Sequence, residues 1–166
     1  YTGGTTGVSK GAVLLHETII ANLLASEAWM QPGLKRKKIT GQTTYVCALP
    51  LYHVFALITC GLLAMRTGGL NILIPNPRDI KATVKALQGH KLNVFPAVNT
   101  LFNALVNDAD FKKLDFSELV ISNGGGMAVQ EAVAKQWLAV TGCPICEGYG
   151  LSETSSGVTC NPTDSE

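Results

Sequence analysis

The sequence predicts an α/β domain in which a parallel sheet carries helices on both faces. Short apolar, β-branched segments alternate along the chain with segments whose apolar residues recur at helical spacing. The short segments are nearly continuous in apolar character, which is typical of strands that are buried on both faces. Strand, helix and strand in this order predict βαβ units. The length of 166 residues fits one domain, so residues 1–166 are expected to form a single unit.

The individual elements follow from these two patterns. Four strands are expected, at residues 43–49, 70–74, 92–95 and 119–122. Three apolar stripes at helical spacing predict helices around residues 19–28, 98–106 and 129–140. Asn76 and Pro77 are typical of an N-cap and a first helical residue, so a fourth helix is expected to run from there to Leu87, with Gly89 ending it.

A basic segment interrupts this alternation. Residues 31–42 contain Pro32, Gly33 and the run Lys-Arg-Lys-Lys at positions 35–38. Such a run can meet anionic lipid or a phosphate-bearing cofactor, but its four charges are at the low end of lipid-binding clusters. A solvated loop is therefore expected over residues 31–42.

The composition excludes several classes of protein. Hydrophobic residues make up 46% of the chain and charged residues only 15%, which indicates a well-covered core. The net charge of +1 gives no electrostatic argument for nucleic-acid binding. No apolar run approaches the roughly 18 to 20 residues that would span a bilayer, and no signal peptide is visible.

The chain has five cysteines, which lie mostly in apolar segments. Buried, reduced thiols in a cytoplasmic protein are the interpretation that we favour. Cys143 and Cys146 form a CxxC motif, but a redox pair usually stands at a helix N-terminus, which lowers the thiol pKa, and this pair does not. No second ligand pair has the spacing of a zinc site, so a structural role is expected.

The most informative segment is the opening run YTGGTTGVSKG at residues 1–11. Its glycines let backbone N–H groups turn toward a ligand, and its hydroxyl groups and Lys10 suit phosphate oxygens. A flexible linker is the alternative, but a linker has little use for a lysine that is framed by glycine and followed by apolar residues. A Walker A loop does not fit, because Val8 and Ser9 separate Gly7 from Lys10. A phosphate-binding loop of another kind is therefore predicted.

Three further segments are expected to be loops that follow strands, at residues 50–55, 123–127 and 147–154. Ligands of α/β folds bind outside the carboxyl ends of the strands, so these loops are candidates for the site. In the second of them, the three consecutive glycines at 124–126 would let a flat ligand approach the main chain closely.

The third loop combines groups that suit a nucleotide and a metal. Tyr149 lies between two glycines, which leaves a face of its ring open for stacking on a base. Ser152 and Glu153 supply a hydroxyl and a carboxylate oxygen, and Mg²⁺ is usually held by one or two carboxylates together with substrate phosphates. Together with the opening loop, these residues predict a site for Mg-ATP.

Each of these residues also has a structural explanation when it is taken singly. The alternatives are a packed core ring for Tyr149, an N-cap for Ser152 and a charge at a helix N-terminus for Glu153. His53, in the first loop, is expected to be a hydrogen-bonded structural imidazole rather than a base.

These motifs together resemble those of the adenylate-forming (AMP-binding) superfamily, which includes acyl-CoA synthetases, firefly-type luciferases and the adenylation domains of peptide synthetases. Residues 1–11 resemble its phosphate loop, and residues 147–153 resemble its adenine and magnesium motif, Tyr-Gly-x-Thr/Ser-Glu. Within it, the chain most resembles bacterial long-chain fatty-acid–CoA ligases, through segments 48–57, 76–79, 98–105 and 124–127. Three positions depart from the residues that are common in the family, and these changes barely affect the assignment: Gly3, Ser9 and Ser152.

The resemblance implies a role for each motif. The phosphate loop would wrap the β- and γ-phosphates of ATP, the triple glycine would border the adenine and the acyl tunnel, and His53 would lie near the mouth of the acyl pocket. Tyr149 would stack on the adenine, Ser152 would contact the α-phosphate and the acyl carboxylate, and Glu153 would hold Mg²⁺. The implied catalytic residues are Lys10, Ser152 and Glu153. The implied nucleotide-binding residues are Thr2, Gly3, Gly4, Thr5, Thr6, Gly7, Lys10, Gly124, Gly125, Gly126, Glu147, Gly148, Tyr149, Gly150 and Ser152.

The resemblance also implies an activity for a longer protein, the parent, of which this chain would be a portion of the large N-terminal domain. The parent would activate a long-chain fatty acid with ATP to an acyl-adenylate and transfer the acyl group to CoA. The family's ribose-binding aspartate, hinge and C-terminal domain with a catalytic lysine fall outside residues 1–166, so the chain alone is expected to be inactive. The alternatives are an enzyme that adenylates aryl or amino acids and a non-catalytic nucleotide-binding module. A cytoplasmic location is expected, and peripheral association of the parent with the inner face of the cell membrane is left open.

Overall fold

The computed structural model describes residues 1–2 and 8–164 and contains a six-stranded sheet with the order β2-β1-β3-β4-β5-β6. The first five strands of this order are parallel, and β6 pairs antiparallel with β5. The strands are β1 (Thr44–Cys47), β2 (Leu70–Leu73), β3 (Val94–Ala97), β4 (Ile121–Gly124), β5 (Ile145–Leu151) and β6 (Ser156–Cys160). The expected α/β class and its largely parallel sheet are therefore confirmed.

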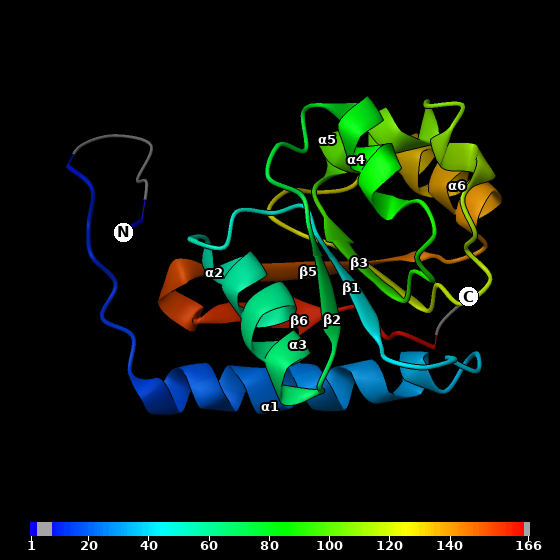
Figure 1. The fold of residues 1–166 in the computed structure, drawn as a ribbon. Coiled ribbons are helices and arrows are strands. Elements are labelled where there is room, and N and C mark those ends of the chain that lie inside the picture. Colours follow the sequence, from blue (N-terminus) through cyan, green and yellow to red (C-terminus); the bar gives the residue numbers. More distant parts are fainter. Residues whose placement is uncertain (3–7, 165–166) are drawn as a thin grey trace.

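Helices lie on both faces of this sheet, as the sequence predicts (Figure 1). One face carries α1 (His16–Leu34) and a continuous helical segment made of α2 (Val54–Ala56), the π-helix η1 (Leu57–Leu62) and α3 (Leu63–Arg66). The other face carries α4 (Ile80–Leu87), α5 (Asn99–Val106) and α6 (Glu131–Thr141). The remaining elements are two 3-10 turns, η2 (Phe111–Lys113) and η3 (Ser152–Thr154). Among the described helices, none is long and apolar enough to cross a membrane.

The core between the sheet and helices α4 to α6 is built around aromatic rings. Phe95 of β3, Phe102 of α5 and Trp137 of α6 are fully buried there, and the ring centroids of Phe102 and Trp137 lie 4.6 Å apart. The indole N–H of Trp137 donates to the hydroxyl oxygen of Ser122 in β4 at 2.9 Å, which satisfies a buried polar atom. The apolar stripes of α5 and α6 are thus core faces, as predicted.

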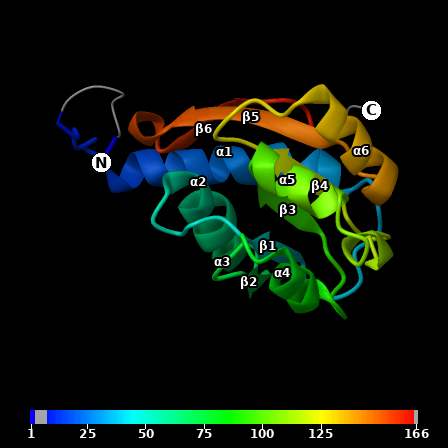
Figure 2. The same cartoon turned by 90° about the horizontal axis from the view of Figure 1, so that it is seen from above.

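A second core lies between the sheet and the helices α1 and α3. Its buried residues are Met30, Tyr45, Leu63, Ala64, Val94, Val120 and Ile121. Figure 2 shows α1 running along β5 and β6, so this long helix spans the part of the sheet that holds the predicted nucleotide motif. Space that these side chains do not fill on this face forms the cavity of the candidate site.

The loop expected over residues 31–42 begins later than predicted, because α1 continues through Pro32 and Gly33 to Leu34. The hydroxyl of Thr163 explains this extension. It accepts the N–H of Gly33 at 2.8 Å and donates to the carbonyl of Trp29 at 3.2 Å, so it bridges two groups that face each other along the helix. A Cβ at position 33 would lie 2.8 Å from the Cβ of Thr163, so only glycine permits this contact. The partner is 130 residues away in sequence, and local reasoning cannot find it.

The prediction that Asn76 caps the fourth helix is wrong. Helix α4 begins at Ile80, and its N-cap is Asp79, whose carboxylate accepts the N–H of Ala82 at 3.0 Å. The side chain of Asn76 instead accepts the N–H of Arg78 at 3.3 Å, so this asparagine makes a turn that precedes the helix. The end of the helix at Leu87 is confirmed.

The segment 147–154 is not a plain loop, because β5 continues to Leu151 and pairs with β6. Its glycines are typical of a turn, but Gly150 packs closely against the backbone of the neighbouring strand β6. A Cβ there would lie 2.2 Å from the carbonyl oxygen of Ser156, so glycine is needed for the close approach of β6. The helical segment 54–66 was also missed, since it lacks the polar face that marks an amphipathic helix.

Candidate functional site

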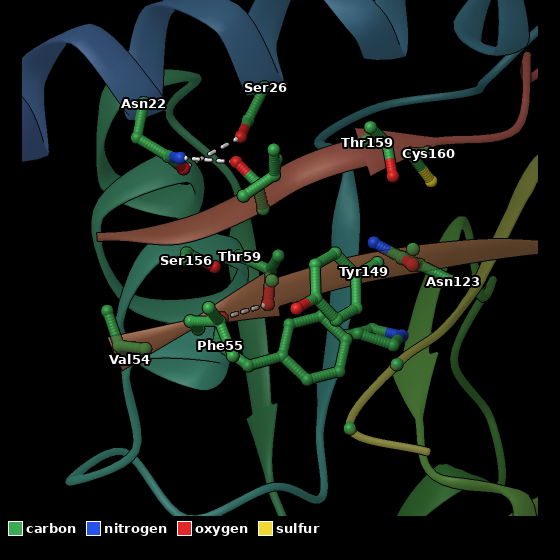
Figure 3. Close-up of a pocket in the computed structure, with 18 of the residues that line it drawn as sticks. Asn22, Ser26, Val54, Phe55, Thr59, Asn123, Tyr149, Ser156, Thr159 and Cys160 are labelled. Carbon is green, nitrogen blue, oxygen red and sulfur yellow. Dashed lines mark hydrogen bonds between the residues drawn. The ribbon is translucent and has the colours of Figure 1, made fainter. Parts of the chain in front are cut away.

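A cavity of about 660 Å³ opens between α1 and the sheet, beside the carboxyl ends of β4 and β5 (Figure 3). Asn22 and Ser26 face it from α1, Phe55 and Thr59 from the helical segment after β1, and Tyr149 from β5. Its volume is within the range of roughly 300–1,000 Å³ that is usual for small-molecule sites. Its position agrees with the rule that ligands of parallel sheets bind at the carboxyl ends of the strands.

The cavity brings together most of the predicted site residues that the structure describes. Those that line it are Thr2, His53, Gly125, Gly126, Gly148, Tyr149, Gly150, Ser152 and Glu153. Lys10, Gly124 and Glu147 do not line it. The predicted residues Gly3, Gly4, Thr5, Thr6 and Gly7 lie outside the described residues.

Tyr149 projects from β5 into the cavity and is not a packed core ring. Its side chain is 60% exposed, and a bulge in the pairing of β5 with β6 lies at Tyr149 and Gly150. A ring that is packed in the core would be buried, whereas this ring is open to the cavity. The structural alternative for Tyr149 is therefore excluded.

Ser152 and Glu153 follow directly in the short turn η3, at the rim of the cavity. The N-cap of this turn is Leu151, so Ser152 is not an N-cap. Thr154 holds the turn in place, because its hydroxyl accepts the N–H of Leu151 at 3.0 Å. Glu153 is exposed, and its carboxylate has no hydrogen-bond or ion-pair partner within the described part of the chain. This carboxylate is thus available to a ligand.

His53 has the structural hydrogen bond that the sequence predicts. Its Nδ1 accepts the backbone N–H of Phe55 at 3.2 Å and caps α2. The imidazole is exposed and also lines the cavity, so one ring nitrogen stabilises the helix start while the ring borders the mouth of the site.

The three glycines after β4 have different surroundings. A Cβ at Gly124 would lie 2.7 Å from Cγ2 of Val129, so this glycine permits core packing. A Cβ at Gly125 would lie 3.0 Å from the ring of Phe55, so this glycine lets the ring lie against the main chain. Gly126 has φ +79°, a conformation that favours glycine. The three glycines therefore serve both the packing of the core next to the cavity and the shape of the cavity wall.

Glu147 holds the end of this glycine loop. Its carboxylate accepts the N–H of Val129 at 3.0 Å, and the side chain of Asn99 accepts the N–H of Gln130 at 2.9 Å. These two bonds link the segment between β4 and α6 to β5 and α5. Within the described residues, Glu147 thus acts on the site through the glycine loop.

The two described ends of the opening loop are hydrogen-bonded to each other. The backbone N–H of Thr2 donates to the carbonyl of Lys10 at 2.7 Å, and Thr2 lines the cavity. The side chain of Lys10 is exposed and has no acidic partner among the residues described. A free ammonium group of this kind is suited to phosphate oxygens.

Several residues of the site were not predicted. Asn22 of α1 donates to the carbonyl oxygen of Gly157 at 2.7 Å and to that of Thr154 at 3.4 Å, which ties β6 and η3 to the helix. Asn123 is buried beside the cavity, and its Oδ1 has no partner among the described groups. Asn22 and Ser26 are polar residues four apart, so they share one face of α1, and that spacing is the signal that could have indicated them.

The cavity also has apolar lining residues. They include Trp29, Met30, Leu63, Val94 and Ile121. Cys160 lines the cavity as well, and burial raises its pKa to about 12, so this thiol is neutral at pH 7. The cavity therefore suits a ligand that has both polar and apolar parts.

The cysteines agree with the structural role expected of them. Four of the five are buried, Cys160 is half-buried, and none forms a disulfide. Burial raises the pKa of Cys146 to about 11, so the CxxC motif lacks the lowered thiol pKa of a redox pair. Among the residues that the structure describes, no group of three or more His, Cys, Asp or Glu side chains could hold a metal ion.

Comparison with known families settles the relationship of the chain. The sequence profile of the AMP-binding enzyme family matches residues 1–166 of the chain. The chain belongs to the AMP-binding enzyme family. The cavity thus belongs to a member of an adenylate-forming family. The opening loop and the segment 147–153 are the motifs that first indicated a nucleotide site in this chain.

The known relatives that this AMP-binding chain resembles include acyl-CoA ligases. It is 50% identical over 164 residues to a long-chain-fatty-acid–CoA ligase of Escherichia coli O6:H1. The matched residues cover 99% of this chain and 28% of the relative. It is 33% identical to the corresponding Bacillus subtilis ligase, over 93% of this chain and 27% of the relative. The chain thus spans less than a third of the length of these relatives.

A solved structure shows the same fold. ATP-bound MatB from Rhodopseudomonas palustris superposes with a TM-score of 0.77 and 27% identity, over 100% of this chain and 31% of that chain. The family and its fold therefore agree with the resemblance seen in the sequence.

Proposed function

We propose that the parent protein activates a long-chain fatty acid with ATP and transfers the acyl group to CoA. The observation that carries this proposal is one cavity whose lining combines two kinds of group. Tyr149, Ser152 and Glu153 bring an exposed aromatic ring, a hydroxyl and a carboxylate to it, and apolar side chains such as Met30, Leu63 and Val94 line it as well. The 50% identity to a long-chain-fatty-acid–CoA ligase supports the choice of an aliphatic acid.

The proposed reaction has two displacements. In the first, an oxygen of the fatty-acid carboxylate attacks the α-phosphorus of ATP, and the bond to pyrophosphate breaks. In the second, the sulfur of CoA attacks the acyl carbonyl carbon, and AMP leaves. Tyr149 would stack on the adenine, and the hydroxyl of Ser152 would contact the α-phosphate and the acyl carboxylate. Chemistry of this kind depends mainly on positioning and on neutralising charge.

The carboxylate of Glu153 fits a magnesium ion shared with the substrate. It is exposed and lacks a partner in the described chain, and no protein cluster of three ligands lies near it in that chain. Mg²⁺ commonly takes only one or two carboxylates and completes its shell with phosphates and water. When bound, the ion would neutralise charge on the phosphates.

The remaining predicted residues have supporting roles in this proposal. Residues 1–11 would wrap the β- and γ-phosphates, with Lys10 as the cation. The glycines 124–126, together with Gly148 and Gly150, would let the nucleotide lie close to the main chain. Glu147 would act by holding the glycine loop through Val129. His53 would border the entrance of the acyl chain.

Fatty-acid-dependent exchange of pyrophosphate into ATP by the parent tests the proposal. We expect exchange with palmitate and little with benzoate or amino acids. Exchange driven by an aryl or amino acid instead would identify another adenylating enzyme. ATP binding without exchange for any acid would indicate a non-catalytic nucleotide-binding module.

Residues 1–166 alone should show no detectable fatty-acid-dependent exchange. The reason is that the family's ribose-binding aspartate and catalytic lysine would both come from outside this chain. The measurement is the same exchange assay on the purified chain, with the parent as the positive control. Exchange by the chain at a rate comparable with that of the parent would contradict this prediction.

Tyr149→Ala in the parent should raise the KM for ATP about tenfold, because stacking of a base on a ring contributes about 1–3 kcal/mol. Tyr149→Phe keeps the ring and should leave the KM nearly unchanged. Tyr52→Ala is the matched control, since Tyr52 is also exposed but does not line the cavity. Equal KM values for the Tyr149→Ala and Tyr52→Ala proteins would remove Tyr149 from the nucleotide site.

A further inference from the structure

The helix that follows β1 changes its hydrogen-bonding pattern where it passes the cavity. It starts as α2, widens into the π-helix η1 over Leu57–Leu62 and returns to an α-helix in α3. Single π-helical turns are rare inside α-helices and are frequent at functional sites. In this chain, the π-helix adjoins the wall of the proposed acyl cavity.

One row of side chains along this helical segment lines the cavity. Phe55, Thr59 and Leu63 are spaced by four residues, and all three line it. Phe55 precedes the π-helix, Thr59 lies within it and Leu63 follows it. The conformation of the π-helix therefore sets how these three side chains stand relative to one another and to the cavity.

A side chain from the edge of the sheet holds the π-helix. The Nδ2 of Asn71 in β2 donates to the carbonyl oxygen of Cys60 at 2.6 Å, inside the π segment. Cys60 is fully buried, so this carbonyl cannot turn to bulk water for a partner. The Oδ1 of Asn71 is buried and has no partner among the described residues, so donation to Cys60 is what fixes the amide.

The hydrogen bond lies behind the cavity wall and not in it. Asn71 is absent from the lining, whereas Thr59 is next to Cys60 in the chain. The hydroxyl of Thr59 donates to the carbonyl of Phe55 at 2.7 Å, which joins the first two members of the row (Figure 3). A shift of the π-helix would thus move the wall as a unit.

We propose that Asn71 is a positioning residue that sets the shape of the acyl cavity by holding the π-helix, and thereby decides which fatty-acid chain lengths the parent accepts. This inference rests on the proposed function. Loss of the Asn71 amide leaves the Cys60 carbonyl to its backbone partners alone. The π turn is then held less firmly, and the row from Phe55 to Leu63 shifts relative to the cavity.

The test is the ratio of kcat/KM for decanoate to that for palmitate, measured on the parent and on its Asn71→Leu and Asn71→Ala proteins. This ratio does not depend on the fraction of correctly folded enzyme, so lower stability alone cannot move it. We expect this ratio to change by about fivefold or more, because one methylene group more or less in an apolar pocket changes kcat/KM by about tenfold or more. Amide hydrogen exchange in residues 57–66 should also become faster.

Asn93→Leu is the matched control. Asn93 is a buried asparagine directly before β3, its side chain also donates to a backbone carbonyl, that of Glu118 at 3.0 Å, and it does not line the cavity. It should lose stability with no change in the ratio. An active parent whose ratio is the same in the Asn71→Leu, Asn71→Ala and Asn93→Leu proteins would overturn the role of Asn71 alone. A parent that activates no fatty acid would overturn the proposed function, and the chain-length statement with it.

Discussion

Glu153→Gln in the parent should lower the rate of acyl-adenylate formation by about 100-fold. Glutamine keeps the size of the side chain but removes the negative charge that would bind Mg²⁺ next to the phosphates. Removing one group that stabilises transition-state charge in an enclosed site typically costs about 10²–10³ in rate. The measurement is fatty-acid-dependent pyrophosphate exchange at saturating ATP, followed over a range of magnesium concentrations.

The matched control for this substitution is Glu131→Gln. Glu131 is an exposed glutamate in the first turn of α6, where it pairs with Lys135, and it does not line the cavity. The Glu131→Gln protein should keep the full rate. Lys10→Ala should lower the exchange rate as well, since it removes the proposed phosphate cation. Unchanged rates in both the Glu153→Gln and Lys10→Ala proteins would contradict the assignment of the site.

Trp137→Ala should destabilise the domain by about 3–5 kcal/mol, which is the usual cost of truncating a buried aromatic side chain to alanine. The indole is fully buried among Phe95, Phe102 and Phe111, and the substitution also leaves the hydroxyl of Ser122 without its donor. Denaturation by urea, followed by circular dichroism, measures the change.

Two further proteins separate the contributions at Trp137. Trp137→Phe retains most of the apolar contact and loses the hydrogen bond to Ser122, so it should cost less than Trp137→Ala. Leu138→Ala, at the next position of α6, changes a side chain that is 45% exposed and should cost far less. A similar loss of stability in the Trp137→Ala and Leu138→Ala proteins would show that the aromatic cluster is not the main core.

Periodicity was sufficient for the elements that bury an apolar face in a regular way. The helices α5 and α6 and the strands β1, β3 and β4 are of this kind, because their side chains meet the core at fixed spacing. It was insufficient for the helical segment 54–66, which is apolar on several sides. It also failed at the C-terminal end of α1. There, hydrogen bonds of the Thr163 hydroxyl extend the helix through Pro32, which was expected to lie in a loop.

The chemical motifs of the site were visible in the sequence because each occupies a short, continuous stretch. Tyr149, Ser152 and Glu153 lie within five residues of one another, and the fold places all three on one cavity. The apolar interior was not visible, since its residues come from α1, α3, β3 and β4. Only folding brings such distant segments together, so no local pattern can mark them.

The sequence by itself determined the α/β class, the parallel sheet and the family to which the chain belongs, because these depend on spacing and on contiguous motifs. The tertiary structure decided which motif residues meet. It placed Tyr149 and Glu153 in the cavity, assigned Gly124 to core packing and turned Glu147 toward Val129. It also decided the helix type beside the cavity, where the side chain of Asn71 donates to the carbonyl of Cys60. The physical reason is that a hydrogen bond or a packed contact between distant residues depends on their final positions, which local propensity does not contain.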